Sequence, residues 1–350
     1  MIPNSNHIIQ FGMNAAATIL ITGGAGFIGS RYVRRLVKDR PEWSIRVLDL
    51  LTYSGSLSNL TGLEGHIQFI RGDIADPEAA RDAVSGCGLV VNCAAESHVD
   101  RSLTDGRPFE RTNIEGVRVL LDAAAAAGVD RFLQVSTDEV YGDLAPTAAP
   151  SVEGNPLRPT SPYAISKAAG DAMVLAAHAE YGLETVLTRG ANTFGPHQYP
   201  EKIIPLFITN AMLGYSIPVY GDGSAVRDYI HVDDHCRGLS LALEHGEPGG
   251  IYNLGGGLRV SALEIAESIV AALNDDKSMI RFVRDRPGHD MRYCMDSSFA
   301  KSIGWQPSAD FQSQLHDTID WYVNNRSWWE PIRNTSTFKQ WMTSWYDDRS

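Results

Sequence analysis

The stretch TILITGGAGFIG, residues 18–29, joins an apolar run to a cluster of glycines, and a helical pattern follows it. Its glycines satisfy two spacings, G-x-G-x-x-G from Gly24 and G-x-x-G-x-x-G from Gly23, both of which end at Gly29. Small residues after a strand let the backbone approach a pyrophosphate, whose charge the helix N-terminus stabilises. We therefore expect a strand, a glycine turn and a helix that bind the diphosphate of a dinucleotide.

A carboxylate ends the next apolar run, RVLD, residues 46–49. Asp49 follows Gly29 by about 20 residues, the spacing at which an acid can accept hydrogen bonds from an adenosine ribose. The same carboxylate would repel a 2′-phosphate, so the pattern favours NAD over NADP. Asp73 ends the following run, where it either lines the adenine end of the site or serves as an ordinary turn residue.

Short β-branched runs alternate with helical patterns up to about residue 190, among them IQFIRGDI (67–74), GLVVNCAAE (88–96) and RFLQVS (131–136). This alternation is typical of parallel strands joined by crossover helices. We expect an α/β protein: a Rossmann-like doubly wound parallel sheet with a smaller C-terminal α/β substrate-binding domain. The expected division is 17–191 plus about 225–256 for the NAD-binding domain, and 192–224 plus 257–350 for the substrate-binding domain.

The 350 residues are 43% hydrophobic and carry a formal net charge of −12. Nucleic acids and anionic membranes attract basic surfaces, so neither is an expected partner, and an anionic ligand must meet local positive charge. The cysteines, Cys87, Cys93, Cys236 and Cys294, lack metal-ligand spacing, and a chain of this size does not need disulfides. We expect a cytoplasmic protein without a metal, and a mobile leader at residues 1–16.

The heptapeptide SPYAISK, residues 161–167, places Tyr163 and Lys167 four residues apart at the start of a helical pattern. Ser161 suits the N-cap and Pro162 the first turn, and the spacing puts the phenol and the ammonium on one helix face. A nearby ammonium lowers the pKa of a phenol, which would let Tyr163 act as a base. The alternative is a chance spacing, because Tyr-x-x-x-Lys is a common pattern.

The stretch QVSTDEVYG, residues 134–142, delivers Thr137, Asp138 and Glu139 directly after an apolar run. One reading is a polar turn that caps the next element. The other is an acid–base pair, because each of two neighbouring carboxylates makes ionisation of the other less favourable and so helps to keep one protonated.

Longer strings carry a resemblance: AAESHVDRS (94–102), VSTDEVYGDL (135–144), GPHQYPEKIIP (195–205), RDYIHVDDH (227–235) and DRPGHDMRY (285–293). With the glycine turn and the Tyr-Lys pair they resemble the extended short-chain dehydrogenase/reductase superfamily and, within it, the dTDP-glucose 4,6-dehydratases. The resemblance runs from about Thr18 to Trp329. It implies NAD as cofactor and a homodimer built on helices near residues 111–127 and 163–181.

The resemblance also implies a role for each acid and base. In such enzymes NAD⁺ removes hydride from C4 of the hexose, water leaves across C5 and C6, and the hydride returns to C6. Tyr163 would take the 4-hydroxyl proton, with Thr137 hydrogen-bonded nearby. Lys167 would belong to the same catalytic set. Glu139 would remove the C5 proton, and a protonated Asp138 would donate to the leaving 6-hydroxyl.

Binding residues follow from the motifs and the resemblance together. The cofactor set comprises Gly23, Gly26, Phe27, Ile28, Gly29, Asp49, Thr52, Asp73, Ile74, Ala94, Ala95, Ser97, Thr112, Tyr163, Lys167 and Thr193. The substrate set comprises Ser97, Thr137, Asn192, Glu201, Lys202, Tyr220, Arg227, Asn253, Arg286 and His289. Arg227 and Arg286 are the candidates for the substrate diphosphate, because a guanidinium can donate two hydrogen bonds to phosphate oxygens.

One stretch departs from the family pattern. RGANTFGP, residues 189–196, stands where Arg-Cys-Ser-Asn-Asn-Tyr-Gly-Pro is common, and it partly resembles UDP-glucose dehydratases. The alternatives therefore include a UDP-glucose or other NDP-hexose 4,6-dehydratase, then a nucleotide-sugar epimerase or decarboxylase, and a non-catalytic NAD-binding sensor. We expect the tryptophans between Trp321 and Trp345 to pack an amphipathic C-terminal segment.

Overall fold

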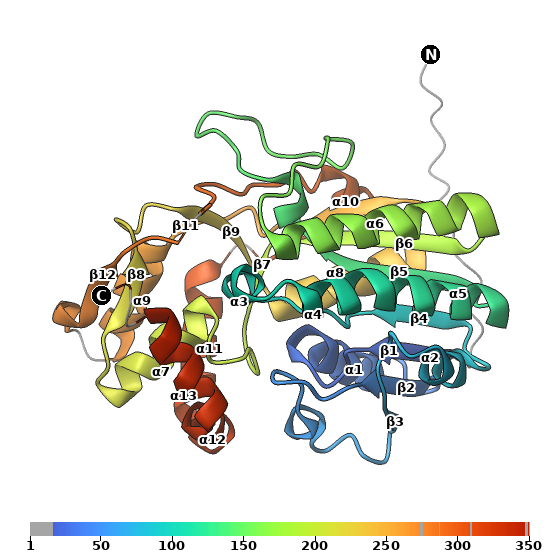
Figure 1. Ribbon diagram of the computed structural model, residues 1–350, viewed down its shortest axis with the longest axis horizontal. Helices are drawn as coiled ribbons and strands as arrows, with labels where there is room; N and C mark the ends of the chain where they lie inside the picture. The colour runs from blue at the N-terminus through green and yellow to red at the C-terminus, as the bar shows by residue number, and fades with distance from the viewer. Residues whose placement is uncertain (1–16, 274–275, 287, 309, 347–348, 350) are drawn as a thin grey trace.

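The computed structural model describes residues 17–273, 276–286, 288–308, 310–346 and 349, so the expected leader at 1–16 lies outside the described residues. Its centre is a sheet of seven strands, all paired in parallel (Figure 1). These strands are β1 (Thr18–Thr22), β2 (Ser44–Asp49), β3 (Ile67–Arg71), β4 (Leu89–Asn92), β5 (Arg131–Thr137), β6 (Glu184–Gly190) and β10 (Ile251–Leu254). The doubly wound sheet expected from the alternating pattern is confirmed.

The strand order is β10-β6-β5-β4-β1-β2-β3, so the chain reverses its direction of travel across the sheet between β1 and β4. In open parallel sheets a crevice forms outside the carboxyl ends of the strands at such a reversal. The glycine turn follows β1 at this point, and Cys93 follows β4.

Helices cover both faces of the sheet. One apolar core packs α1 (Phe27–Asp39) and α8 (Val232–His245) on one face. A second core packs α2 (Pro77–Val84), α5 (Val117–Ala127) and α6 (Pro162–Tyr181) on the other. Shorter helical segments lie in the connections: η1 (Leu57–Leu60), α3 (Val99–Thr104), α4 (Arg107–Glu110), η2 (Arg111–Gly116), η3 (Asp138–Tyr141) and α10 (Ser298–Ser302). With both faces buried, the central strands can be apolar along their whole length.

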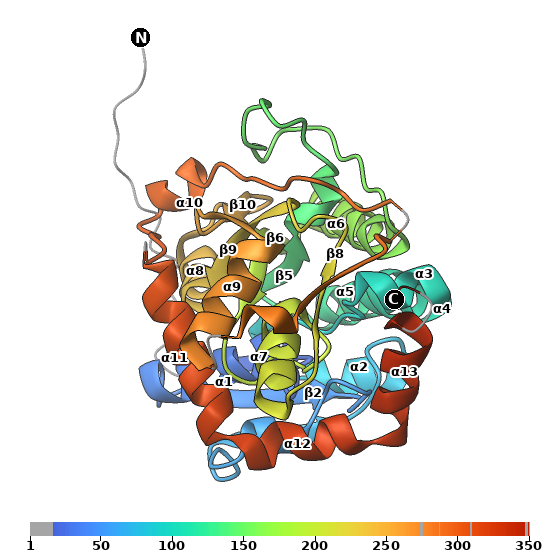
Figure 2. The same cartoon turned by 90° about the vertical axis from the view of Figure 1, so that its left-hand side faces the viewer.

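A smaller region with its own apolar core lies beside the carboxyl ends of the sheet (Figures 1 and 2). Its three-stranded sheet contains β7 (Asn192–Phe194), β9 (Val226–His231) and β11 (Arg259–Ser261), and its two-stranded sheet pairs β8 (Ile217–Tyr220) with β12 (Ile280–Val283). Its helical elements are α7 (Ile203–Leu213), α9 (Ala262–Leu273), η4 (Lys277–Met279), α11 (Phe311–Asn324), α12 (Arg326–Asn334) and α13 (Ser336–Tyr346).

The chain passes between the two regions more than once. After β9, which pairs with β7 and β11, the chain returns through α8 and β10, and β10 pairs with β6 in the large sheet. The division into two domains at the expected residues remains a prediction. None of the helices in the described part of the chain has the length and apolar character that a membrane span requires.

Candidate active site

The glycine turn is closely packed against its surroundings. Gly23 has a φ of +63°, and a Cβ there would lie 2.6 Å from the Ala94 backbone nitrogen. A Cβ on Gly29 would lie 2.2 Å from the Gly23 carbonyl oxygen. Only glycine at this position therefore lets the start of α1 pack so closely against the turn. Gly26 is the N-cap of α1 and offers no side-chain cap. The first amides of α1 therefore remain available to an anion, as a pyrophosphate site requires.

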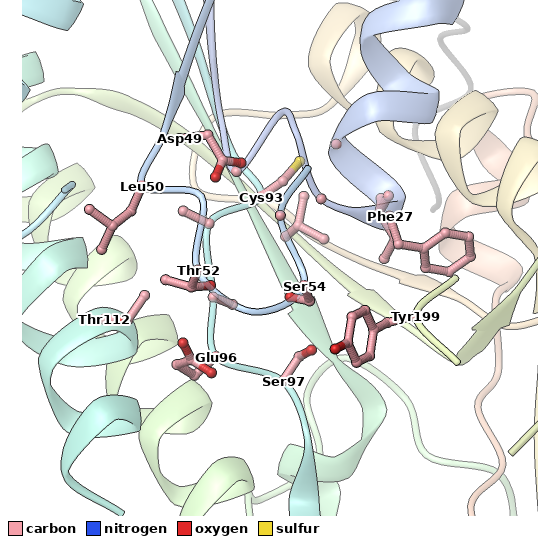
Figure 3. Close-up of a pocket in the computed structure, with 18 of the residues that line it drawn as sticks. Phe27, Asp49, Leu50, Thr52, Ser54, Cys93, Glu96, Ser97, Thr112 and Tyr199 are labelled. Carbon is pink, nitrogen blue, oxygen red and sulfur yellow. The ribbon is translucent and has the colours of Figure 1, made fainter. Parts of the chain in front are cut away.

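Asp49 ties the end of β2 to the glycine turn. Its Oδ2 accepts a hydrogen bond from the Ala25 amide at 2.9 Å, and its Oδ1 accepts one from the Leu51 amide at 2.8 Å. Burial raises the pKa of this carboxyl, and the two amides oppose that shift. Asp49 faces the cavity together with Thr52 (Figure 3), as a residue that binds a ribose must.

This first cavity brings together every residue of the expected cofactor set except Thr193. It extends from Asp49 and Asp73 to Tyr163 and Lys167. Sequence reasoning missed several of its lining residues, including Tyr53, Cys93, Glu96 and Tyr199. The glycine turn, the free amides at the start of α1 and the buried carboxyl of Asp49 together fit a dinucleotide. Tyr53 could have been found, because it lies four residues after Asp49 in the connection that follows the strand.

The expected catalytic residues meet beyond the end of β5. Thr137 is the last residue of the strand and the N-cap of η3. Its Oγ1 donates to Asp138 Oδ1 at 3.3 Å, accepts from the Glu139 amide at 3.3 Å, and is hydrogen-bonded to Tyr163. The strand end thus holds buried Asp138, half-buried Glu139 and the Tyr163 phenol in one cluster.

The two carboxylates have different electrostatic surroundings. Burial and the charge of Glu139 raise the pKa of Asp138 well above its ordinary range, and Asp138 Oδ2 has no hydrogen-bond partner among the described residues. Burial also raises the pKa of Glu139, but Arg286, Arg227 and Lys202 oppose that shift. Asp138 is therefore the better proton donor of the pair, and Glu139 the better base.

Tyr163 and Lys167 lie on the first two turns of α6, as the spacing predicts. Ser161 caps this helix by accepting from the Ala164 amide at 3.1 Å, and Lys167 Nζ donates to the Val135 carbonyl at 2.8 Å. Burial, with the charge of Glu139, raises the pKa of Tyr163, so the expectation of a lowered phenol pKa was wrong. Burial also lowers the pKa of Lys167.

A second cavity lies between the large sheet and the smaller region. It is lined by Ser97, Asn192, Glu201, Lys202, Tyr220, Arg227, Arg286 and His289 of the expected substrate set, and by Glu139. Sequence reasoning missed further lining residues, including Asp100, Tyr293 and Tyr346. Lys202 also lines the first cavity and donates to the Ser97 carbonyl at 2.6 Å, so the two cavities adjoin at these residues.

Two arginines give the second cavity its positive charge. Arg227 Nη2 donates to the Asp290 carbonyl at 2.6 Å, and its guanidinium lies 4.5 Å from the centre of the Tyr293 ring. Arg286 Nε lies 3.6 Å from Asp100 Oδ1. Both arginines line the cavity while neighbouring groups restrain them, which suits recognition of a diphosphate.

Asn253 does not belong to this site, and its assignment to the substrate set needs correction. The side chain is fully buried in β10 and lines neither of the two cavities. Its Oδ1 accepts from the Tyr141 hydroxyl at 2.8 Å, and its Nδ2 donates to the Ser151 carbonyl at 3.1 Å. These contacts occupy the amide and join β10 to the segment after η3.

A third cavity joins the catalytic cluster to the stretch that departs from the family pattern. It is lined by Thr137, Asp138, Glu139 and Tyr163, and by Gly190, Ala191, Asn192, Thr193 and Phe194. Thr193 Oγ1 lies 2.8 Å from His235 Nδ1, and a Cβ on Gly190 would lie 2.5 Å from the same ring. Of the stretch, only Asn192 also lines the second cavity. The substitutions therefore lie beside the acid–base groups.

The C-terminal helices reach the site through Arg101. Both Nε and Nη2 of Arg101 donate to Glu201 Oε2, at 2.9 and 2.7 Å. Its guanidinium lies 4.1 Å from the Tyr53 ring centre and 4.5 Å from that of Trp341 on α13. Trp345 Nε1 donates to the Tyr220 hydroxyl at 2.6 Å. These tryptophans therefore do more than pack an amphipathic segment.

Comparison with known proteins agrees with this geometry. A model of the NAD dependent epimerase/dehydratase family matches residues 19–255. A dTDP-glucose 4,6-dehydratase of Streptomyces niveus is 46% identical over 323 residues, which cover 90% of this chain and 96% of that protein. The chain therefore belongs to the NAD-dependent epimerase/dehydratase family, and the resemblance found in the motifs is confirmed.

Solved structures refine this placement within the family. A dTDP-glucose 4,6-dehydratase of Streptomyces venezuelae with NAD bound has a TM-score of 0.87 at 44% identity, covering 90% of this chain and 99% of that chain. A UDP-glucose 4-epimerase of Thermotoga maritima has a TM-score of 0.82 at 30% identity, covering 88% and 99%. The dehydratase is the more similar of these two in both sequence and fold.

Proposed function

We propose that this protein is an NAD-dependent hydro-lyase that converts dTDP-glucose to dTDP-4-keto-6-deoxyglucose and water. The observation that carries the proposal is the pair of adjacent carboxyls, buried Asp138 and half-buried Glu139, which follow Thr137, the hydrogen-bond partner of Tyr163. An oxidation and reduction at one carbon needs a single proton carrier. Loss of water across two further carbons needs an acid and a base as well.

NAD, when bound in the first cavity, supplies the oxidation at C4 of the hexose and the later reduction at C6. Tyr163 accepts the proton of the 4-hydroxyl, and its hydrogen bond with Thr137 lowers the pKa of the phenol against the larger effect of burial. Lys167, held by the Val135 carbonyl, supplies positive charge on the same face of α6. The glycine turn and Asp49 orient the dinucleotide for this step.

Elimination follows because a 4-ketone acidifies the neighbouring C5–H. Glu139 removes that proton, since the cations around it favour its carboxylate form. Asp138 donates a proton to the 6-hydroxyl, which leaves as water, since burial and the charge of Glu139 keep Asp138 protonated. Hydroxide is a poor leaving group, so this acid is essential to the step. Arg227 and Arg286 bind the diphosphate of the substrate in the second cavity.

One assay tests the proposal directly. The purified protein with NAD is given dTDP-, UDP-, GDP- and CDP-glucose in separate reactions, and the alkaline absorbance of a 4-keto sugar is followed. We expect the highest kcat/KM with dTDP-glucose. Preference for UDP-glucose would favour the alternative specificity, which the stretch RGANTFGP (189–196) suggests. Conversion to a 4-epimer without loss of water would contradict the dehydratase assignment.

We also propose that the protein acts in the cytoplasm as a homodimer. The support is analogy with the family and the exposed outer face of α6, where Ile165 is 53% exposed. An exposed apolar side chain on a long helix is common at an interface between copies. Light scattering coupled to size exclusion should give twice the mass of the 38.3 kDa chain. A monomer at micromolar concentration would contradict the proposal.

A further inference from the structure

A groove separate from the three cavities lies in the smaller region, between the end of α7, the β8–β12 pair and the helices α12 and α13. We call it the α7–α13 groove. Its lining includes Tyr215, Pro218, Arg281, Arg333, Lys339 and Tyr346. Neither the family relationship nor the proposed reaction uses most of these residues.

The charge of the α7–α13 groove is opposite to that of the whole chain. Arg281, Arg333 and Lys339 line it, and none of the described lining residues is acidic. None of these three cations forms an ion pair with a carboxylate in the described part of the chain. In a protein with a formal net charge of −12, three unpaired cations in one groove create a local positive field.

Arg333 is the buried centre of this charge. Its Nη1 donates to Thr209 Oγ1 and its Nη2 donates to Asn210 Oδ1 at 2.7 Å, and both acceptors are neutral. Its guanidinium lies 5.3 Å from the Phe338 ring centre. Burial lowers the pKa of Arg333 to about 10, with no carboxylate opposing the shift. A buried cation without a counter-charge is costly, and an anion in the groove would remove that cost.

The other two cations stand on different walls. Arg281 projects from β12, where it pairs in register with Pro218 of β8, and Lys339 projects from α13. Both are exposed, so they can approach a ligand from two sides. We propose that the α7–α13 groove is a binding site for the phosphate or diphosphate group of a small phosphorylated molecule. Tyr215, 58% exposed at the rim, offers a ring face to the rest of that molecule.

The groove shares a wall with the second cavity, because Pro218 and Tyr346 line both. A test must therefore separate binding in the groove from binding at Arg227. We would titrate the NAD-loaded Arg227→Ala protein with inorganic pyrophosphate in a calorimeter, so that the second cavity is weakened and the groove is intact. Adding Arg281→Ala and Lys339→Ala removes the two exposed cations, and adding Lys301→Ala instead removes an exposed cation of α10 as a matched control.

We expect pyrophosphate to bind the Arg227→Ala protein and the Lys301→Ala control with equal affinity. The protein lacking Arg281 and Lys339 should bind at least about tenfold more weakly, because two charge-assisted contacts are lost. Its melting temperature should match that of the control, since both side chains are exposed. Equal affinity in all three proteins would overturn the proposal, as would no binding to the Arg227→Ala protein.

Discussion

Asp138 and Glu139 are adjacent in the sequence, yet their side chains meet different charges. Glu139 lines the second cavity with Arg227, Arg286 and Lys202, whereas Asp138 lines the third cavity and not the second. Because η3 starts at Asp138, successive side chains leave the backbone in different directions. One turn therefore supplies two carboxyls with different proton affinities, which is what an elimination requires.

Isosteric variants of this pair should stop the reaction at different steps. Asp138→Asn keeps the shape of the protonated acid but cannot donate its proton, so turnover should fall by on the order of 10²-fold or more. Exchange of the C5 hydrogen with solvent deuterium should survive in Asp138→Asn, because Glu139 is intact. Glu139→Gln should lose both turnover and exchange. Mass spectrometry of recovered substrate measures the exchange.

The two variants serve as controls for each other, because both remove one carboxylate from the same buried turn. General damage to the cluster would reduce exchange equally in both. If Asp138→Asn turned over at the unaltered rate, or if Glu139→Gln still exchanged the C5 hydrogen, the assigned roles would be wrong.

Asp49 should determine the choice between NAD and NADP. Asp49→Ala removes the ribose acceptor and the repulsion of a 2′-phosphate, so NAD affinity should fall at least about tenfold and the gap to NADP should narrow. Since Asp49 also accepts from the Ala25 amide, Asp49→Asn is the control that keeps an acceptor oxygen there. Fluorescence titration with both dinucleotides gives the affinities. Equal affinity of the unaltered protein for NAD and NADP would contradict the prediction.

At the scale of elements, α13 reaches the active site from the far end of the chain. Its Trp341 ring contacts the Arg101 guanidinium, as does the ring of Tyr53 from the connection after β2. Arg101 in turn binds Glu201, which lines the first and second cavities. A contact on α13 can therefore affect the geometry of both cavities.

Replacing Trp341 tests this connection. A cation–π contact at a partly buried site contributes about 1 kcal/mol, so Trp341→Ala should raise KM for the nucleotide sugar by about threefold to tenfold. The value of kcat should change little, because the contact that is lost is one to Arg101, which is not among the acid–base residues. Trp341→Phe keeps a ring face and should restore most of the affinity. Steady-state kinetics measure KM and kcat for each variant. An unchanged KM in Trp341→Ala would show that α13 is not coupled to the site.

The elements near the glycine turn could be predicted from the sequence because their signals are local. Gly29, Asp49 and the Tyr163–Lys167 spacing each reflect a turn, a strand end or a helix face. Tyr346 and Trp341 could not be predicted in the same way, because α13 reaches the site only through tertiary packing. The assignment of Asn253 was wrong for a related reason, because its hydrogen-bond partners Tyr141 and Ser151, far away in the sequence, decide where its amide points.

The phenol pKa was mispredicted because burial is also a tertiary property. The sequence shows that Lys167 lies one helical turn after Tyr163, but it does not show how completely the pair is removed from water. In the structure burial is the largest influence on both groups. The same limit applies to Asp138, whose raised pKa depends first on burial and then on Glu139.

At the scale of the whole molecule, charge is unevenly distributed. The chain carries a formal net charge of −12, yet Lys202, Arg227 and Arg286 gather around the second cavity. This agrees with the expectation that an anionic ligand must meet local positive charge. Several carboxyls are instead buried near the junction of the two regions, among them Asp138 and Asp228. Such buried acids make the stability of the fold depend on pH.

Asp228 shows the sign of this dependence. Burial raises its pKa from 3.8 to about 7, although backbone amides including that of Leu258 oppose the shift. The folded protein therefore binds this proton more tightly than the unfolded chain does. The resulting stabilisation is fully present below the ordinary aspartate pKa and is lost as the pH rises through about 7.

Asp228→Asn should remove this pH dependence. The amide oxygen can still accept from the Leu258 amide, and the amide nitrogen replaces Oδ2, which has no partner among the described residues. At pH values above 7 the variant should melt higher than the unaltered protein by on the order of a few degrees, and the difference should shrink toward pH 4. The exposed Asp317→Asn variant is the control. We expect its melting temperature to differ little from that of the unaltered protein at every pH. Thermal melts at several pH values measure this. The melting temperatures of Asp228→Asn and the unaltered protein could instead differ by the same amount from pH 4 to pH 8. That result would show that Asp228 does not bind its proton more tightly in the folded state.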